Sequence, residues 1–295
     1  IGSLLLARSL AAFESHRCCL RSRAVGAVMD ESSLVRAILR AITGAVMLFI
    51  YLPLVILAVY AFNASPLGGW PPSGLTLSRF GEAAGSPAIR EALANSLIVA
   101  TISTLLALIL GTLAALAMQR YAFFGKNAIS FLFVLPIALP GVVTGISLQS
   151  SFKLFGVDLG LHTIVIAHAT FCVVVAYNNV VARLRRLPRS PEEASADLGA
   201  DSWMTFRRIT LPGMRTALLS GGLLAFALSF DEVIVTLFAA GPGARTLPVW
   251  VFSELQRSYQ LPVVNVVALL LVLVSVIPVW IAQRIGGGEI ARGGR

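Results

Sequence analysis

Hydrophobic residues in this chain are gathered into long runs that short polar segments separate. An α-helix rises about 1.5 Å per residue, so roughly 20 consecutive apolar residues cross the hydrocarbon core of a membrane. Six runs reach that length. The pattern predicts an all-α, polytopic membrane protein with six transmembrane helices in residues 41–283. The predicted spans are 41–62, 93–118, 128–152, 161–182, 214–240 and 263–283.

Two of these runs contain residues that disturb helices. Pro53 predicts a kink in the first span, and the third span is broken by Pro136, Pro140, Gly141 and Gly145. Backbone groups freed by such residues must find partners inside the protein, because lipid offers none. We therefore expect the third span to pack in a bundle rather than to face lipid. A shorter helix at the membrane surface is expected around residues 77–90.

Charge is scarce and unevenly placed. Hydrophobic residues make up 57% of the chain and charged residues 13%, whereas a typical soluble domain is about a quarter charged. The net charge of +9 does not indicate nucleic-acid binding, because the basic residues lie in the gaps between apolar runs. Alternate gaps, counted together with Arg215 just beyond one of them, hold 18 of the 23 Lys and Arg residues, and basic residues favour the cytoplasmic side. Both termini are therefore expected in the cytoplasm. The expected cytoplasmic segments are 1–40, 119–127, 183–213 and the tail 284–295.

The first 28 residues stand apart from this pattern. Met29, followed by Asp30 and Glu31, has the character of a natural start. Most basic residues before it follow a short apolar run, whereas a signal peptide carries its positive charges ahead of its apolar core. We interpret residues 1–28 as an upstream extension and assign them no function.

The longest polar segment between two predicted spans is residues 190–212. Ser190 is a favourable helix N-cap, and Glu193 follows at the spacing of a capping box. Gly199 is expected to end this helix in the left-handed conformation. Asp201 is expected to cap a second helix, which Pro212 is expected to break before the fifth span. The segment therefore predicts two short helices joined at a glycine.

Asp231 and Glu232 are the only two of the 14 acidic residues that fall inside a predicted span. A carboxylate inside a membrane is costly and marks a pathway or a polar cavity by default. Arg215, at the cytoplasmic edge of the fifth span, is the one basic residue inside a predicted span, and it lies 16 residues before Asp231. The nearby Phe226 and Phe230 offer aromatic faces that attract cations. The pattern favours passage of a cation. The alternatives are a basic residue on a partner subunit or a water-filled vestibule.

Other chemical signals are weak. His162 and His168 lie in the fourth span, where hydrogen bonding within a bundle is favoured over a proton relay. The three cysteines form no disulfide framework, and no Cys/His spacing indicates a metal site. No Gly-rich phosphate loop and no hydrolytic triad motif occurs. We therefore expect no covalent catalysis, metal or cofactor in this chain.

The spacing within residues 190–212 resembles the EAA loop of ABC importer permeases of the MetI-like fold. That pattern is EAA, three residues, Gly, nine residues, then I-x-LP, and the one departure here is Ser195 where the family usually has Ala. The resemblance implies a cytoplasmic coupling helix that docks on an ATPase subunit, which would bind ATP and magnesium. The residues matched to that role are Glu193, Ala194, Ser195, Gly199, Leu211 and Pro212.

Four stretches are similar to spermidine/putrescine permeases of the second-subunit type: residues 227–238 with the following 241–243, and the segments 245–248, 93–97 and 135–141. This resemblance covers about residues 40–283. It implies a multi-pass subunit of the bacterial inner membrane, paired with a second permease, two ATPase copies and a periplasmic polyamine-binding protein. An importer for another solute, such as ferric iron, an opine or an amino-acid-like cation, and an ATP-independent secondary transporter are the alternatives. The expected substrate-path residues are Asp231, Glu232, Phe230, Tyr177 and Asn178.

Overall fold

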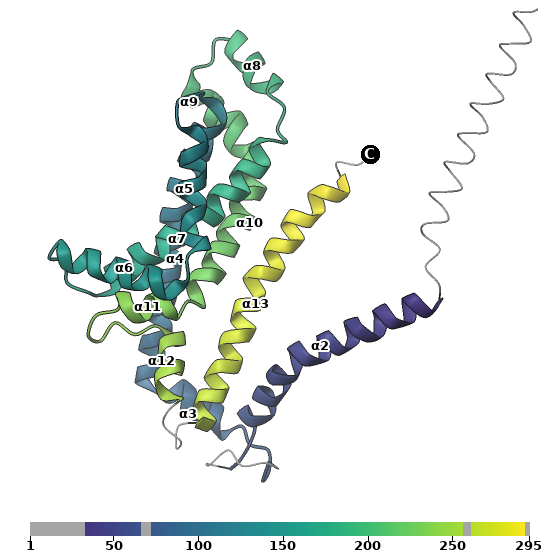
Figure 1. Ribbon diagram of the computed structural model, residues 1–295, viewed down its shortest axis with the longest axis vertical. Coiled ribbons are helices and arrows are strands. Elements are labelled where there is room, and N and C mark those ends of the chain that lie inside the picture. Colours follow the sequence, from purple (N-terminus) through teal and green to yellow (C-terminus); the bar gives the residue numbers. More distant parts are fainter. Residues whose placement is uncertain (1–32, 66–71, 256–260, 293–295) are drawn as a thin grey trace, which may run out of the picture. The chain divides into compact units, whose positions relative to one another are not determined.

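A computed structural model describes residues 33–65, 72–255 and 261–292 (Figure 1). The chain divides after Ile56 into two units, and each is described by itself. Most of the described residues are helical, which confirms the all-α prediction. The elements are α2 (Ser33–Ala61), α3 (Ser78–Gly85), α4 (Pro87–Arg120), α5 (Lys126–Ala138), α6 (Gly141–Leu154), α7 (Leu161–Leu184), α8 (Ser190–Asp197), α9 (Ser202–Thr205), the π-helix η1 (Phe206–Thr210), α10 (Leu211–Phe230), α11 (Ile234–Ala239), α12 (Leu247–Glu254) and α13 (Leu261–Arg292).

Five helices in the described residues are long and apolar enough to cross a membrane. Four of them, α2, α4, α7 and α13, coincide with the first, second, fourth and sixth predicted spans. The helix α2 continues through Pro53, as expected for a kinked span. The surface helix expected near residues 77–90 is α3, and a break at Ser86 separates it from α4.

The third predicted span, 128–152, is not one helix. It consists of α5, with 13 residues, and α6, with 14, and Leu139 and Pro140 separate them. Pro140 has no N–H with which to continue the α5 ladder, so the chain turns and a new helix begins at Gly141. The helix α5 packs against α7 and α6 packs against α11, while Phe131 of α5 is 70% exposed in this single chain.

The fifth predicted span, 214–240, is also interrupted. The helix α10 ends at Phe230, three residues are not helical, and α11 resumes at Ile234. Asp231 and Glu232 therefore lie in a gap between two helices rather than inside one. Hydropathy predicted a continuous helix here because it measures only how many consecutive residues are apolar. It does not show whether their backbone hydrogen bonds are continuous.

The core of the second unit is formed by α4, α7 and α10, which pack against one another (Figure 1). Small residues permit close approach, as at other helix contacts in membranes. A Cβ atom on Gly111 of α4 would lie 2.9 Å from the backbone nitrogen of Tyr177 on α7. Ser103 of α4 also donates a hydrogen bond to the Val165 carbonyl, at 3.0 Å. The three helices therefore form a closely packed scaffold.

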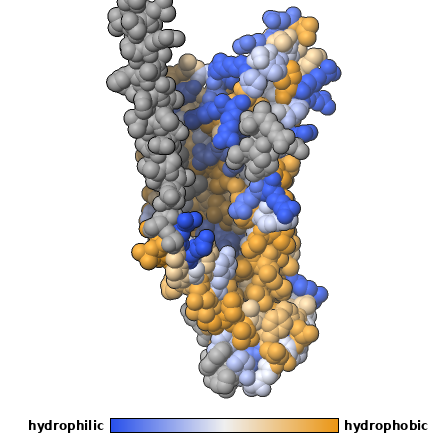
Figure 2. All heavy atoms as spheres, turned by 90° about the vertical axis from the view of Figure 1, so that its right-hand side faces the viewer, coloured by the Kyte–Doolittle hydropathy of each residue, from blue (hydrophilic) through white to orange (hydrophobic). Residues whose placement is uncertain are grey.

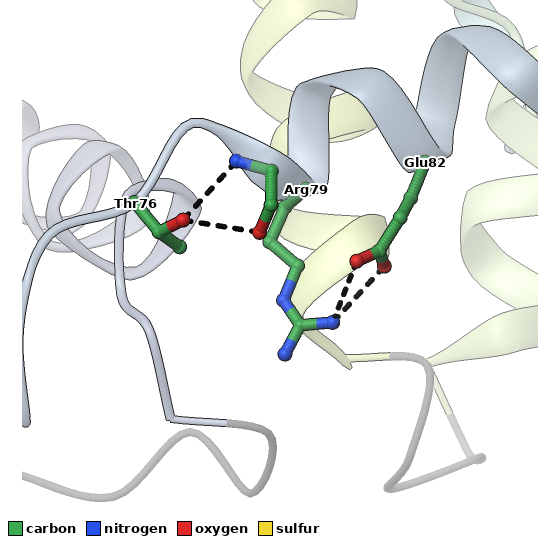
Figure 3. A network of polar contacts seen from close by, with 4 residues as sticks. Thr76, Arg79 and Glu82 are labelled. Atoms are coloured by element: carbon green, nitrogen blue, oxygen red, sulfur yellow. Dashed lines mark hydrogen bonds and ion pairs between the residues drawn. The ribbon is translucent and has the colours of Figure 1, made fainter.

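This unit has two distinct ends (Figure 1). One carries α8 and α9, and the other carries α3, α11 and α12; we name them the α8 end and the α3 end. On the face shown in Figure 2, hydrophilic side chains gather towards the upper, α8 end and hydrophobic ones cover much of the lower half. At the α3 end, Thr76 accepts a hydrogen bond from the Ser78 N–H and Arg79 pairs with Glu82 at 3.0 Å (Figure 3). Local polar contacts thus fix the start of α3.

Candidate functional site

Residues 190–212, which we name the coupling loop, form the helix–turn–helix that the sequence predicts. Gly199 ends α8 with φ 81°, and its N–H bonds to the Ala196 carbonyl at 2.9 Å. A Cβ atom at Gly199 would meet nothing within 4 Å, so glycine is needed for the dihedral angle and not for space. Asp201 caps α9 by accepting a hydrogen bond from the Met204 N–H at 2.6 Å. Both of these predictions are confirmed.

The predicted capping box at Ser190 does not form. The N-cap of α8 is Arg189, without a side-chain cap hydrogen bond, and Ser190 is already the first helical residue. Arg189 has helical dihedral angles, and its carbonyl accepts hydrogen bonds from the N–H groups of Glu192 and Glu193. The chain thus enters α8 in a helical conformation, whereas a capping side chain requires an extended residue.

Pro212 does not break the second helix of the coupling loop. The helix runs from Ser202 through η1 to Phe230. The N–H of Leu211 bonds five residues back, to the Phe206 carbonyl. This π-turn shifts the ladder immediately before Pro212, which has no N–H to contribute, and the helix continues. Leu211 is half-buried and Pro212 is exposed.

Side-chain contacts tie the coupling loop to the scaffold. Arg120, the last residue of α4, forms an ion pair with Glu192 and donates to the Thr210 hydroxyl at 3.0 Å. Thr210 in turn donates to Glu192 at 2.5 Å. Ser195, the departure from the family pattern, bonds to Thr205 of α9 at 3.0 Å. Arg120 and Glu192 were not among the predicted site residues; the available signal was a lone Arg at the end of a long apolar run.

The remaining face of the coupling loop is open. Glu193, Ala194 and Gly199 are exposed. Beside them the hydrophobic side chains of Leu198 and Trp203 are 88% and 66% exposed. Exposed hydrophobic side chains next to a carboxylate are typical of a surface that binds another protein. Glu193 therefore faces outward, while its neighbour Glu192 is held internally.

Residues 231–233 form the second region, which we name the acidic break. Glu232 folds back on α11, where its Oε1 accepts a hydrogen bond from the Val235 N–H at 2.9 Å. Its carbonyl accepts a hydrogen bond from the Thr236 hydroxyl, also at 2.9 Å. Asp231 is exposed, and the described residues contain no ion pair to either carboxylate. One acid thus stabilises the start of a helix, and the other is presented outward.

The other predicted path residues do not gather around Asp231. Phe230 is 2% exposed and its ring stacks on Phe226, so a solute reaches it only if the core repacks. Tyr177 is buried against Phe133 of α5, with ring centroids 4.9 Å apart. Asn178 is exposed.

His168 lies opposite the acidic break on α7 and is fully buried. Its Nδ1 lies 2.7 Å from the Ser229 hydroxyl and its Nε2 lies 2.8 Å from the Thr236 hydroxyl. These contacts confirm that His168 is hydrogen-bonded within the bundle. Tyr177 lies nine residues after His168 on α7, which is about 14 Å along the helix axis, so the two side chains are at different heights in the scaffold. No group of three metal-binding side chains comes together in the described part of the chain.

Residues 107–287 match the protein family described as the binding-protein-dependent transport system inner membrane component. The chain belongs to this family. The matched residues include the coupling loop and the acidic break. This inner membrane component is a transport subunit, and its five long apolar helices agree with a multi-pass membrane protein.

Individual relatives cover most of this inner membrane component. It is 38% identical to the putrescine transport system permease protein PotI of Escherichia coli K12, over 76% of this chain and 81% of the relative. It is 33% identical to the spermidine/putrescine transport system permease protein PotC of the same strain, over 82% and 90%. A bacterial ABC transporter involved in the import of alginate shares the fold, with a TM-score of 0.66 at 15% identity over 85% of this chain and 94% of that one.

Proposed function

We propose that this chain is the permease subunit of an ATP-driven importer that carries polyamines such as putrescine and spermidine. Its family and the two polyamine permeases among its relatives support the proposal. The observation that carries the cargo assignment is Asp231, an exposed carboxylate at a break between two membrane helices. Polyamines are flexible chains of ammonium groups, which such a carboxylate attracts.

The coupling loop is the proposed docking site for an ATPase subunit. Its exposed face offers Glu193, Ala194 and the hydrophobic Leu198 and Trp203 to a partner. Two ATPase copies would bind ATP and magnesium, one on this chain and one on a second permease subunit. The 295 residues contain no Gly-rich phosphate loop, and we assign ATP hydrolysis to the ATPase.

The proposed orientation places the α8 end and both termini in the bacterial cytoplasm. The distribution of Lys and Arg supports it, with 18 of 23 in the segments assigned to that side or, for Arg215, just beyond one of them. The α3 end then faces the periplasm, where a substrate-binding protein would deliver the polyamine. The acidic break lies nearer this end of the scaffold (Figure 1).

Continuity of the helix from Ser202 to Phe230 supports a mechanical link between the two regions. Its 29 residues extend about 43 Å and join the coupling loop directly to the acidic break. We infer that closure of the ATPase dimer displaces α8 and α9, and that this helix carries the displacement towards Asp231. The chain would thereby alternate between outward-open and inward-open states.

Asp231 would hold an amine only briefly. An ammonium about 4 Å from a carboxylate gains roughly 4 kcal/mol at an effective dielectric constant of 20, before the cost of removing water. Passage requires binding that favours entry and still permits release. Tyr177 and Asn178 would act at a later level of the path. Glu232 would contribute through the geometry of the break rather than through its charge.

The alternatives remain an importer for another solute and a secondary transporter that works without ATP. The helix-capping role of Glu232 favours the first of these, because it gives one of the two acids a structural use. Under that alternative the fold and the coupling loop are unchanged and only the cargo differs.

Reconstitution of the complete transporter tests the proposed function. The chain, its second permease, the ATPase and the binding protein are placed in liposomes, and uptake of labelled putrescine is measured with and without ATP. We expect uptake that requires ATP and the binding protein and that unlabelled spermidine reduces. Uptake driven by an ion gradient alone, or ATP-driven uptake of ferric iron or an opine without uptake of amines, would contradict the proposal.

A further inference from the structure

His168 joins the two helices on either side of the acidic break. Ser229 belongs to the last turn of α10, and Thr236 belongs to the first turn of α11. Both hydroxyls bond to the ring of His168, at 2.7 and 2.8 Å, from opposite nitrogens. The three side chains are at most 2% exposed. One residue of α7 thus fixes both edges of a gap in which the backbone is not helical.

The direction of these hydrogen bonds follows from the donors available. The Thr236 hydroxyl donates its one proton to the Glu232 carbonyl, at 2.9 Å. It must therefore accept from His168, so Nε2 carries the ring proton. Nδ1 is then the acceptor, and the Ser229 hydroxyl donates to it. The network is neutral, every polar group in it has a partner, and it ends on the backbone of the acidic break.

Such a network holds a backbone geometry more strictly than apolar packing does. Buried hydrogen bonds are directional, and a buried donor or acceptor that loses its partner is costly. The Asp231 N–H still bonds to the Ala227 carbonyl at 3.2 Å, and the Val233 carbonyl accepts from the Leu237 N–H at 2.9 Å, but the backbone between them is not helical. Such a short irregular segment has several accessible backbone conformations. The hydrogen bonds of His168 and Thr236 restrict the acidic break to few of these backbone conformations. Asp231 is the exposed side chain in this gap, so its position depends on the same contacts.

We propose that His168 is a positioning residue for transport, which holds the acidic break in the geometry that presents Asp231 to the solute. The inference rests on the proposed role of Asp231 in the path. Removing the hydroxyl of Ser229 or Thr236 should then lower transport through misplacement of Asp231, although the charge of Asp231 is kept.

Two hydroxyl-removing variants test this inference, because His168→Phe leaves two buried hydroxyls without partners and risks misfolding. Thr236→Val keeps the shape of the side chain and removes its hydroxyl, and Ser229→Ala removes the donor to Nδ1. Thr170→Val is the matched control. Thr170 lies on α7, as His168 does, and its hydroxyl donates only locally, to the Ala167 carbonyl. The readout is putrescine moved per ATP hydrolysed in the reconstituted complete transporter. We expect a roughly threefold decrease in both test variants and none in the control.

A double-mutant cycle with Asp231→Asn separates positioning from general damage. If Asp231→Asn alone lowers the ratio about tenfold and Thr236→Val about threefold, independent effects multiply to roughly thirtyfold. We expect instead that the double variant stays near the tenfold loss, because a mispositioned residue has no further effect once its charge is gone. Multiplied effects, or no effect of Thr236→Val, would overturn the inference. No effect of Asp231→Asn alone would be a different failure, that of the proposed role of Asp231.

Discussion

The coupling loop and the acidic break each contain two adjacent acidic residues, and each uses them in the same divided way. In the coupling loop Glu192 bonds to Arg120 and Thr210, whereas Glu193 is exposed. In the acidic break Glu232 caps α11, whereas its neighbour is exposed. One member of each pair is hydrogen-bonded within the protein, Glu192 to side chains and Glu232 to a backbone N–H, and the other meets solvent. Adjacent acids are therefore not interchangeable in either region.

The two regions differ in what holds them. The ion pair in the coupling loop is partly exposed, with side-chain accessibilities of 37% and 27% for Arg120 and Glu192. Such pairs contribute little and are screened by salt. The acidic break is held by buried, neutral hydrogen bonds around His168. The coupling loop can therefore be displaced at a modest cost in free energy. The acidic break is expected to keep its geometry while the helix from Ser202 to Phe230 moves.

The largest expected effect comes from Gly199→Val in the coupling loop. A β-branched residue is strained at φ 81°, so the turn between α8 and α9 should open. We expect nearly complete loss of the ATP hydrolysis that the loaded binding protein stimulates, with the subunit still inserted. Gly156→Val is the matched control, because Gly156 has φ 65° and also meets nothing within 4 Å, but lies between α6 and α7. Equal loss in both variants would refute a specific coupling role.

A smaller effect is expected when the two acids of the coupling loop are compared. Glu192→Gln removes the ion pair to Arg120 and should lower the free energy of unfolding by about 1 kcal/mol, since the pair is partly exposed. Glu193→Gln should leave stability unchanged and weaken association with the ATPase. Thermal unfolding of the purified subunit and a binding measurement with the ATPase distinguish the two. A loss of stability in Glu193→Gln alone would reverse the assigned roles.

Much of the coupling loop could be predicted from the sequence because its determinants are local. A left-handed turn requires glycine, and a side-chain cap requires an acceptor two or three residues before a free N–H; Gly199 and Asp201 satisfy these rules. The effect of Pro212 was predicted wrongly because a π-turn shifts the hydrogen bonds in front of it. The contact of Arg120 with Glu192 joins residues 72 positions apart, and no local rule predicts it.

The acidic break, in contrast, could be predicted from the sequence only in part. Its chemical character was evident from two carboxylates in an apolar run, but its geometry was not. The interruption at residues 231–233 is flanked by contacts of His168 with Ser229 and Thr236, which are 61 and 68 positions away. Over 128–152 hydropathy alone marks a single run, but the Pro and Gly residues within it predict a broken span, and the missing N–H of Pro140 divides the segment in two. Helix interruptions that tertiary contacts stabilise are not visible in a hydrophobic run.

The most direct test of the central claim compares Asp231→Asn with Glu232→Gln in the reconstituted transporter. Both variants remove one negative charge from the acidic break, but Gln keeps an oxygen that can accept from the Val235 N–H, so the cap of α11 is retained. We predict that Asp231→Asn lowers putrescine moved per ATP about tenfold, a loss of about 1.4 kcal/mol, and that Glu232→Gln changes it little. Unchanged transport in Asp231→Asn, or an equal loss in Glu232→Gln, would contradict the assignment of Asp231 to the polyamine path.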